Sequence, residues 1–287
     1  PTLAAIPERL EVARKVAPER VLVELTKLLT GVHPGAGLQP LRASGLLGLW
    51  LPELQPMAGC GQNRHHRYDV WEHTLEVVRL APAEPEFRWA ALLHDAGKPG
   101  TRTEASVGEA HFYGHEARSL ELAGAILGRL KAANRLQKDV LALIRHHGTH
   151  PEPAWSDAAC RRFLRRLVED GLPLDRWAAF RLADQRAKGL EDPDRDLRHQ
   201  AVVDRLVAMA SAQPPLSVRD LALDGEALMA LAGRRGGPWL GRLQAALLDA
   251  VLEAPSLNTP EALAALARAS LDGSAPPPGP PAPPPVR

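Results

Sequence analysis

Two adjacent polar residues, His94 and Asp95, directly follow an apolar run near the end of a helical pattern. His73 lies in line with apolar residues three before and four after it, and Asp184 with apolar residues seven and four before it. At helical spacing, these two side chains are expected on the inward faces of separate helices. A buried carboxylate needs a cation or several hydrogen-bond donors. Imidazoles and carboxylates together favour a shared divalent metal ion, whose charge also keeps the aspartates ionised.

Further histidines follow the same pattern. His115 shares a stripe with apolar residues of its predicted helix, and so does His147, which is preceded by His146. For any one of them taken alone, the alternative is a core histidine with a single hydrogen bond. Several inward polar groups that cannot all satisfy one another favour the metal ion.

Helices are the elements that must position these residues, because apolar residues recur at helical spacing through nearly the whole chain. Asp69 is followed three residues later by Glu72, a capping-box pattern that predicts the start of a helix. Only Ala110–Tyr113 is expected to be extended, and no alternation of period two indicates a sheet. The predicted fold class is therefore all-α. The helices expected to carry the histidines and aspartates are Asp69–Leu80, Glu86–Ala96, His115–Leu130, Leu136–His147 and Leu174–Lys188.

The composition is that of a globular protein without a dominant charge. The 287 residues are 45% hydrophobic and 24% charged, with a formal net charge of +1, which excludes a wholly disordered chain and a strong global attraction to nucleic acid or membranes. Cys60 and Cys160 lie far apart, which argues against a disulfide scaffold or a zinc ribbon. No apolar run reaches the roughly 18 residues of a spanning helix, and no secretory leader opens the chain. We therefore expect a cytoplasmic protein with no membrane partner.

Any contact with RNA must then come from local basic features. Arg161, Arg162, Arg165 and Arg166 occupy one side of a predicted helix, and such a strip can follow phosphates. A second basic run is Arg64–Arg67. The alternative for the helical strip is an ordinary solvated face.

The two ends of the sequence have their own signatures. Eight of the 27 prolines lie in the last fourteen residues, so residues 273–287 are expected to form a disordered proline-rich tail. The first residue is Pro1 rather than methionine, which indicates a chain trimmed or cut from a longer one.

The spaced pattern His … His-Asp … Asp resembles the HD superfamily of metal-dependent phosphohydrolases, whose domains are helical. The resemblance implies four ligands for a first metal ion, namely His73, His94, Asp95 and Asp184. It also implies that His115, His146 and His147 are the additional histidines of HD proteins with a second metal ion. Either member of the adjacent pair could bind, and a role without metal stays open for each of the three.

In HD enzymes that this chain resembles, the lysine of His-Asp-x-Gly-Lys faces the substrate phosphate, and Lys98 occupies that position. Lys98 is also explained as a cation at a helix C-terminus, and the two roles are compatible. Arg102 is a second candidate to hold phosphate. A divalent ion lowers the pKa of a coordinated water towards about 7; Asp95 would bind the ion and orient that water, and Lys98 would stabilise charge on the phosphoryl oxygens. The expected reaction is hydrolysis of a phosphate ester, with Ni²⁺, Mn²⁺, Mg²⁺, Co²⁺ or Fe²⁺ as cofactor.

Further motifs resemble, in order, the neck and body of bacterial tRNA nucleotidyltransferases, the CCA-adding enzymes of the poly(A) polymerase family. The segments that carry the likeness are Ala17–Leu29, Leu51–Leu54, Asp69–Thr74, Trp89–Pro99, Phe112–Glu116 and Gly237–Glu261. The likeness implies a helical neck-like segment over residues 1–55, an HD domain over 56–210 and a C-terminal body-like segment over 211–272. It implies a phosphorylated nucleotide or RNA as substrate, with tRNA as a candidate partner, and carries no signal of the oligomeric state.

The nucleotide-adding head of that family is not recognisable in the sequence. Its Gly-Ser followed by Asp-x-Asp has no counterpart, because the only Gly-Ser here precedes prolines and the Asp-x-Asp strings lie in the charged run Asp192–Asp196. The chain alone is therefore not expected to add nucleotides. The leading hypothesis is a phosphatase or 2′,3′-cyclic phosphodiesterase acting on nucleotides or RNA 3′ ends, within or derived from a tRNA nucleotidyltransferase and so part of tRNA 3′ processing. The alternatives are a non-catalytic tRNA-binding body and a phosphodiesterase for signalling nucleotides.

Overall fold

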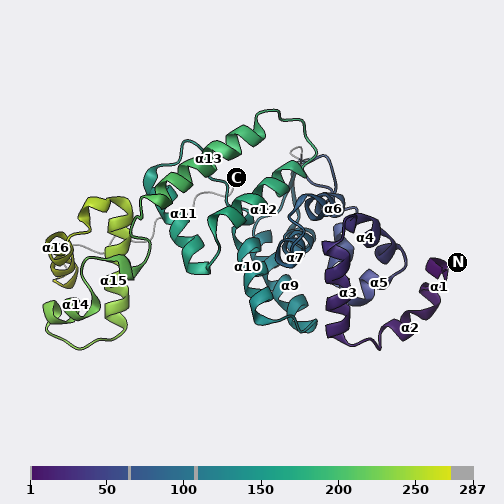
Figure 1. The fold of residues 1–287 in the computed structure, drawn as a ribbon, viewed down its shortest axis with the longest axis horizontal. Helices are drawn as coiled ribbons and strands as arrows, with labels where there is room; N and C mark the ends of the chain where they lie inside the picture. The colour runs from purple at the N-terminus through teal and green to yellow at the C-terminus, as the bar shows by residue number, and fades with distance from the viewer. Residues whose placement is uncertain (1, 64–65, 107–108, 273–287) are drawn as a thin grey trace. The chain divides into compact units, whose positions relative to one another are not determined.

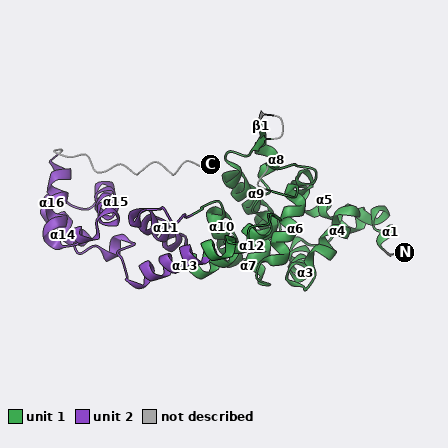
Figure 2. Cartoon of the chain, turned by 90° about the horizontal axis from the view of Figure 1, so that it is seen from above, with its two compact units in different colours: residues 1–150, 171–199 green, residues 151–170, 200–287 purple. Residues whose placement is uncertain are grey.

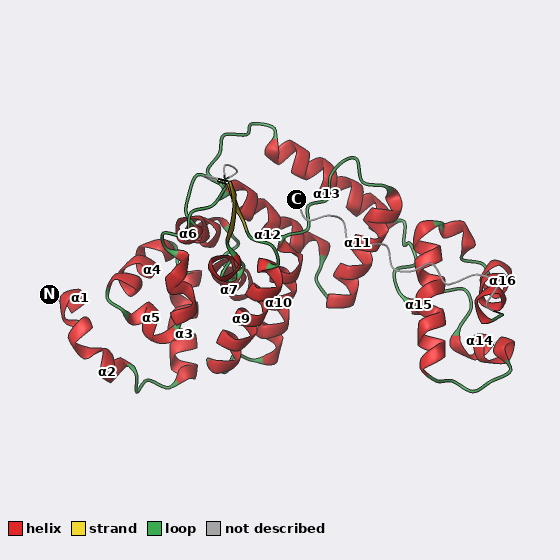
Figure 3. Ribbon diagram, turned by 180° about the vertical axis from the view of Figure 1, so that it is seen from behind, coloured by secondary structure: helices red, strands yellow, loops and turns green. Residues whose placement is uncertain are grey.

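The structure is a computed structural model that describes residues 2–63, 66–106 and 109–272 (Figure 1). Within these ranges the chain consists almost entirely of helices (Figure 3), which confirms the all-α prediction. The proline-rich tail expected over 273–287 lies outside the described residues, as do Arg64 and His65 of the second basic run.

The chain divides into two compact units, coloured separately in Figure 2. Unit 1 consists of residues 1–150 and 171–199, and unit 2 of residues 151–170 and 200–287. The α-helices that lie wholly in unit 1 are α1 (Thr2–Ala5), α2 (Leu10–Ala13), α3 (Pro18–Thr30), α4 (Pro34–Ala43), α5 (Leu46–Trp50), α6 (Val70–Leu80), α7 (Pro85–Leu93), α8 (Lys98–Thr101), α9 (His115–Arg129), α10 (Asn134–His147) and α12 (Leu174–Arg186). Two 3₁₀ turns, Pro7–Arg9 and Pro52–Met57, connect the early helices.

Helix α7 is the centre of unit 1. It packs against α3, α6, α9, α10 and α12, and each of its residues from Phe87 to Leu93 is buried. Arg88 is tolerated there because its guanidinium donates to the backbone carbonyls of Val78 and Pro82, at the end of α6 and just beyond it, where a helix leaves acceptors without partners. Trp89 Nε1 donates to Thr26 Oγ1 of α3 at 2.9 Å, which joins the N-terminal helices to the core.

Local sequence signals explain where α6 and α7 begin and end. The Asp69 side chain accepts from Glu72 N at 2.7 Å, the N-cap bond expected from the sequence. Pro85 occupies the first position of α7, where a missing N–H costs nothing. This helix was expected to reach Ala96 and ends at Leu93 instead, so the two polar residues after it lie in a turn.

One expectation about strands was wrong. Strands β1 (Thr103–Ser106) and β2 (Glu109–His111) form a small antiparallel sheet, with Thr103 opposite His111 and an irregularity after Glu104. Only part of the segment expected to be extended, Ala110–Tyr113, belongs to it. Strands of three or four residues are too short for a period-two alternation to stand out, which is why periodicity alone did not indicate a sheet.

Unit 2 has its own apolar core. Helix α15 (Pro238–Glu253) packs against α11 (Asp157–Asp170), α14 (Gly225–Ala232) and α16 (Pro260–Leu271). Two 3₁₀ turns, at 218–220 and 255–257, complete the unit, and α13 (Arg195–Ser211) begins in unit 1 and continues into unit 2. The buried residues of this core are Leu221, Leu228, Leu243, Leu247, Leu248, Val251, Leu252, Leu263 and Ala267.

Candidate metal centre

The four residues expected to hold a first metal ion come from three parts of unit 1 and meet at one point. His73 lies in α6, His94 and Asp95 directly follow α7, and Asp184 lies in the second half of α12. All four side chains are buried. Helices α6 and α12 both pack against α7. Each carries one polar residue on its buried face, His73 on α6 and Asp184 on α12, and these two side chains therefore lie next to the turn that follows α7.

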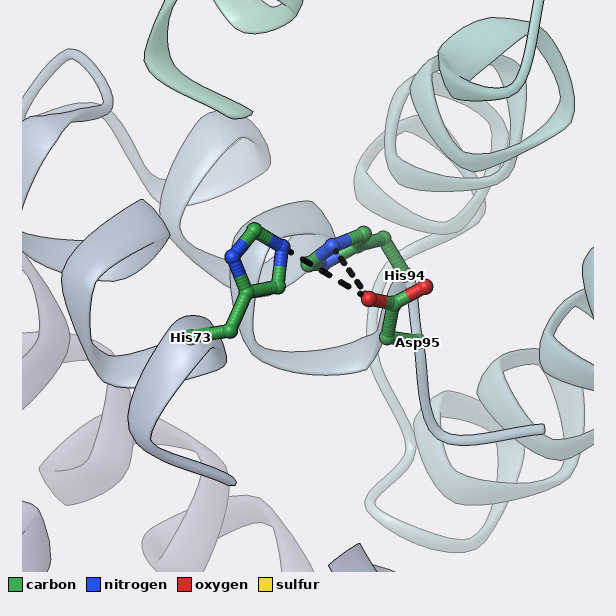
Figure 4. A group of neighbouring side chains, drawn as sticks. All are labelled: His73, His94 and Asp95. Carbon is green, nitrogen blue, oxygen red and sulfur yellow. Dashed lines mark ion pairs between the residues drawn. The ribbon is translucent and has the colours of Figure 1, made fainter. Parts of the chain in front are cut away.

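The distances bring His73, His94 and Asp95 close enough to share an ion, and Asp184 lies beside both rings. His73 Nε2 lies 3.2 Å from Asp184 Oδ1 and 3.6 Å from Asp95 Oδ2. His94 Nε2 lies 3.2 Å from Asp95 Oδ2 and 3.8 Å from Asp184 Oδ1. Figure 4 shows both rings turned toward the Asp95 carboxylate. Two ligands that each bind an ion at about 2.1 Å are at most about 4.2 Å apart, and all four separations meet that limit.

The hydrogen bonds of the His73 and His94 rings use one nitrogen of each ring and leave the other for such an ion. The Nδ1 atom of His73 donates to the Ala187 carbonyl at 3.3 Å, and that of His94 to the Ala91 carbonyl at 2.9 Å. In a neutral ring, Nε2 then keeps its lone pair. Both Nε2 atoms are buried, and neither makes a hydrogen bond to any described residue. A buried polar atom without a hydrogen bond is costly, and a cation at this point would remove that cost.

A second group of possible ligands adjoins the first through Asp95. Its other oxygen, Oδ1, lies 3.6 Å from His115 Nε2 and 3.8 Å from His147 Nε2. The Nδ1 atoms of both rings again face backbone carbonyls, at 2.8 Å and 2.5 Å. The structure thus brings His147 to this group, while the His146 carbonyl accepts from Trp177 Nε1. One carboxylate therefore faces two groups of histidines, one with each oxygen.

The charges of the site keep its carboxylates ionised. Burial alone would raise the pKa of the Asp95 carboxyl, but neighbouring His94 and Lys98 outweigh it and hold this pKa well below its usual range. Burial likewise opposes ionisation of Asp184, and His73 and Arg181 outweigh it, so that its pKa is also well below the usual range. Burial lowers the pKa of His115, which favours the neutral ring that a metal ligand needs.

Lys98 is placed at the edge of the first group. Its Nζ atom lies 2.7 Å from Asp95 Oδ2 and donates to Gln62 Oε1 at 2.6 Å. Arg102, the second candidate to hold phosphate, donates from Nε to the Gly61 carbonyl at 3.3 Å and pairs with Glu104 at 2.8 Å. Both cations expected to meet phosphate therefore contact the same short loop before α6.

The arginine strip expected to contact RNA lies in unit 2, where three of its four members contact α15. Arg161 donates to the Leu252 and Glu253 carbonyls, Arg162 pairs with Glu253 at 2.6 Å, and Arg165 pairs with Asp249 at 2.5 Å. These contacts give the three side chains a structural role in unit 2. Contact with a substrate stays a prediction for them.

Three residues of the site gave no signal in the sequence. Gln62 contacts Lys98. Arg181 donates to Asp184 Oδ2 at 2.9 Å, and the side chains of Arg181 and Asp184 are both buried. Ser119 Oγ, on α9, accepts from Gly97 N at 2.9 Å and so fixes the turn after α7 to the helix of His115. Only the i,i+3 spacing of Arg181 and Asp184 on α12 could have suggested one of these contacts.

Comparison with known proteins agrees with this geometry. Residues 70–209 match the family model of the HD domain, and residues 1–57 match that of a probable RNA and SrmB-binding site of polymerase A. A CC-adding tRNA nucleotidyltransferase of Thermus thermophilus is 39% identical over 83% of this chain and 53% of its own length. The chain is homologous to the body region of tRNA nucleotidyltransferases.

Other relatives give the same result. An A-adding enzyme of Deinococcus radiodurans is 36% identical over 81% of this chain and 54% of its own length. A multifunctional CCA protein of Cupriavidus necator is 32% identical over 82% of this chain and 56% of its own length. The chain thus spans about half the length of these curated relatives. Across the described residues, every helix is too short or too polar to span a membrane.

Proposed function

We propose that unit 1 is a metal-dependent phosphohydrolase that cleaves phosphate esters of nucleotides or RNA 3′ ends, as a phosphatase or 2′,3′-cyclic phosphodiesterase. The observation that supports this most is the pair of buried Nε2 atoms, on His73 and His94, that face Asp95 and Asp184 without a hydrogen bond. Two imidazoles and two carboxylates are a donor set for a divalent ion of the first transition row. When bound, that ion would supply a Lewis acid and a nucleophile derived from water.

The remaining residues supply what the ion does not. The backbone carbonyls that accept from Nδ1 hold the four rings in one orientation, which is the usual support of metal-binding histidines. Lys98 has a charge next to Asp95 Oδ2 and would neutralise charge on phosphoryl oxygens. Burial of the cluster lowers the local dielectric and strengthens each of these interactions.

Hydrolysis of p-nitrophenyl phosphate and of adenosine 2′,3′-cyclic phosphate by the full chain tests this function, with Ni²⁺, Mn²⁺, Mg²⁺, Co²⁺ or Fe²⁺ added singly. We expect turnover with at least one ion, and its loss in His94→Ala/Asp95→Ala. A matched control is His111→Ala/Glu109→Ala, on strand β2. Activity that survives the first double substitution would contradict the proposal, and preferential hydrolysis of a cyclic dinucleotide or guanosine tetraphosphate would favour the signalling alternative.

Unit 2 supports a second candidate function, the binding of tRNA. Residues 227–248 contain three arginines and no acidic residue, and Arg234, Arg235 and Arg242 are exposed. Within the described part of the chain, no acidic side chain pairs with them, whereas Arg162 and Arg165 of α11 pair with Glu253 and Asp249. The Arg234 guanidinium stacks over Trp239 at 4.1 Å from the ring centroid. Arginines held this way suit an RNA phosphate backbone, and a cytoplasmic role in tRNA 3′ processing would follow.

A tRNA binding assay at several salt concentrations separates the two candidates. We expect Arg234→Ala/Arg235→Ala to weaken binding and to reduce the salt slope by about 0.9 for each phosphate that is no longer neutralised. Arg162→Ala is the comparison, because its partner is Glu253 within the unit. An equally large effect in both variants would remove the preference for residues 234–242, and tRNA binding without any turnover would favour a non-catalytic body. Nucleotide addition is not proposed for the chain alone.

A further inference from the structure

The loop before α6 holds the lysine beside the candidate metal centre. Residues 59–62 are fixed to the start of this helix at both ends of the loop. Asp69, the N-cap residue, accepts from Gly59 N at 2.7 Å with its second oxygen. At the other end, Gln62 Nε2 donates to the Tyr68 carbonyl at 3.2 Å. The Gln62 side chain is therefore held in place by backbone that also fixes the helix of His73.

The other half of the Gln62 amide contacts Lys98. Gln62 Oε1 accepts from Lys98 Nζ at 2.6 Å, and Asp95 Oδ2 lies 2.7 Å from the same nitrogen. An ammonium group has three N–H donors in tetrahedral arrangement. A hydrogen bond from one of them to a fixed acceptor stops rotation about the Cε–Nζ bond, so the directions of the other two donors are set as well.

We propose that Gln62 is a positioning residue, which fixes the rotation of the Lys98 ammonium so that another of its N–H groups is directed at an oxygen of the substrate phosphate. This inference rests on the function proposed above and adds a residue through which Lys98 acts. Asp95 does not do this: its Oδ2 lies 2.7 Å from Lys98 Nζ, but it makes no hydrogen bond within the described residues. The Phe112 ring, 5.5 Å from Lys98 Nζ, restricts the side chain but accepts no directed bond.

Substitution Gln62→Met tests the inference in the full chain, because methionine has a similar length and neither accepts nor donates. With the metal ion that supports turnover, we expect KM for adenosine 2′,3′-cyclic phosphate and the inhibition constant of inorganic phosphate each to rise about tenfold. That change equals about 1.4 kcal/mol and is the usual size of an ordering cost for one long side chain. Metal content should stay at the wild-type value, because the hydrogen bonds of the Gln62 side chain go to the Tyr68 carbonyl and to Lys98 rather than to the candidate metal ligands.

A double-mutant cycle separates positioning from a purely structural role. If Gln62 acts through Lys98, then Gln62→Met should have no further effect in a Lys98→Met background. The matched control is Gln137→Met on α10. This substitution removes the hydrogen bond that Gln137 Nε2 donates to the Ala132 carbonyl at 2.7 Å. Unchanged KM in Gln62→Met, or an equal effect on top of Lys98→Met, would overturn the inference.

A chemical measurement distinguishes failure of the Gln62 inference from failure of the proposed phosphohydrolase function. Acetylation of Lys98 by acetic anhydride, measured by peptide mass spectrometry against exposed Lys27, should be several times faster in Gln62→Met than in the wild type. If the wild type neither hydrolyses phosphate esters nor binds phosphate, the proposed function fails and this inference fails with it. If the wild type does both and Gln62→Met is unchanged in KM and acetylation, only the inference fails.

Discussion

The buried ion pair between Arg181 and Asp184 should make the stability of the chain depend strongly on divalent metal. Arg181 is 5% exposed and Asp184 is 6% exposed, and their charged atoms are 2.9 Å apart. Removing one partner of such a pair leaves a buried charge uncompensated and costs about 3–5 kcal/mol. This is a large share of the roughly 5–15 kcal/mol by which native proteins are stable.

We therefore expect Arg181→Met to lower the free energy of unfolding by about 3–5 kcal/mol in metal-free protein. Saturating metal should recover most of that stability, because an ion bound to Asp184 Oδ1 supplies the positive charge that the variant lacks. Urea denaturation followed by circular dichroism, with and without the ion that supports turnover, measures both values. Arg181→Lys retains the charge and provides a milder variant if Arg181→Met does not fold.

The control for this experiment is Arg186→Met on the same helix. Arg186 pairs with Asp196 on the surface, where both side chains are more than 40% exposed, and such pairs contribute about 0–1 kcal/mol. Its small effect should not depend on metal. An equal loss of stability in Arg181→Met with and without metal would refute the argument that Asp184 faces a metal ion.

Three further predictions concern the surroundings of the site. A Cβ at Gly97 would collide with the backbone carbonyl of His115, so Gly97→Ala should cost about 1–3 kcal/mol in urea denaturation and lower metal content. Thr26→Val leaves Trp89 Nε1 buried without its acceptor and should cost about 1–3 kcal/mol; a Trp89→Phe background should abolish most of this effect. Burial lowers the pKa of His199, so the folded chain binds this proton less readily than the unfolded chain, and stability should fall as pH drops below about 6.5. His199→Phe should flatten that part of the pH–stability curve.

The inward placement of His73 and Asp184 could be predicted because its signal is local. A polar residue in line with apolar ones on a helix is assigned to the inward face by periodicity alone, as for His73 and Asp184. The choice between His146 and His147 could not be made this way, since neighbouring residues differ by only about 100° around a helix. Their placement depends on how α10 is rotated against α7, which is a property of packing.

Contacts between distant segments were beyond the sequence. Arg165 lies on a basic strip that resembles a solvated face, and its partner Asp249 is 84 residues away, so no local pattern distinguishes a structural arginine from one that meets RNA. Gln62 is an ordinary polar residue of a loop until the fold places it beside Lys98. Side chains of this kind are recognised only when the acceptors and donors around them are known.

The bond from Trp89 to Thr26 has a practical meaning for anyone who isolates the part of the chain that carries the candidate metal centre. Cutting at the limits of the matching HD model, residues 70–209, would remove α3 from one side of a fully covered central helix and leave the indole without its acceptor. The uncovered apolar surface would invite aggregation. An excised fragment should therefore start ahead of Pro18, and inactivity of a shorter one would report damaged packing rather than absent chemistry.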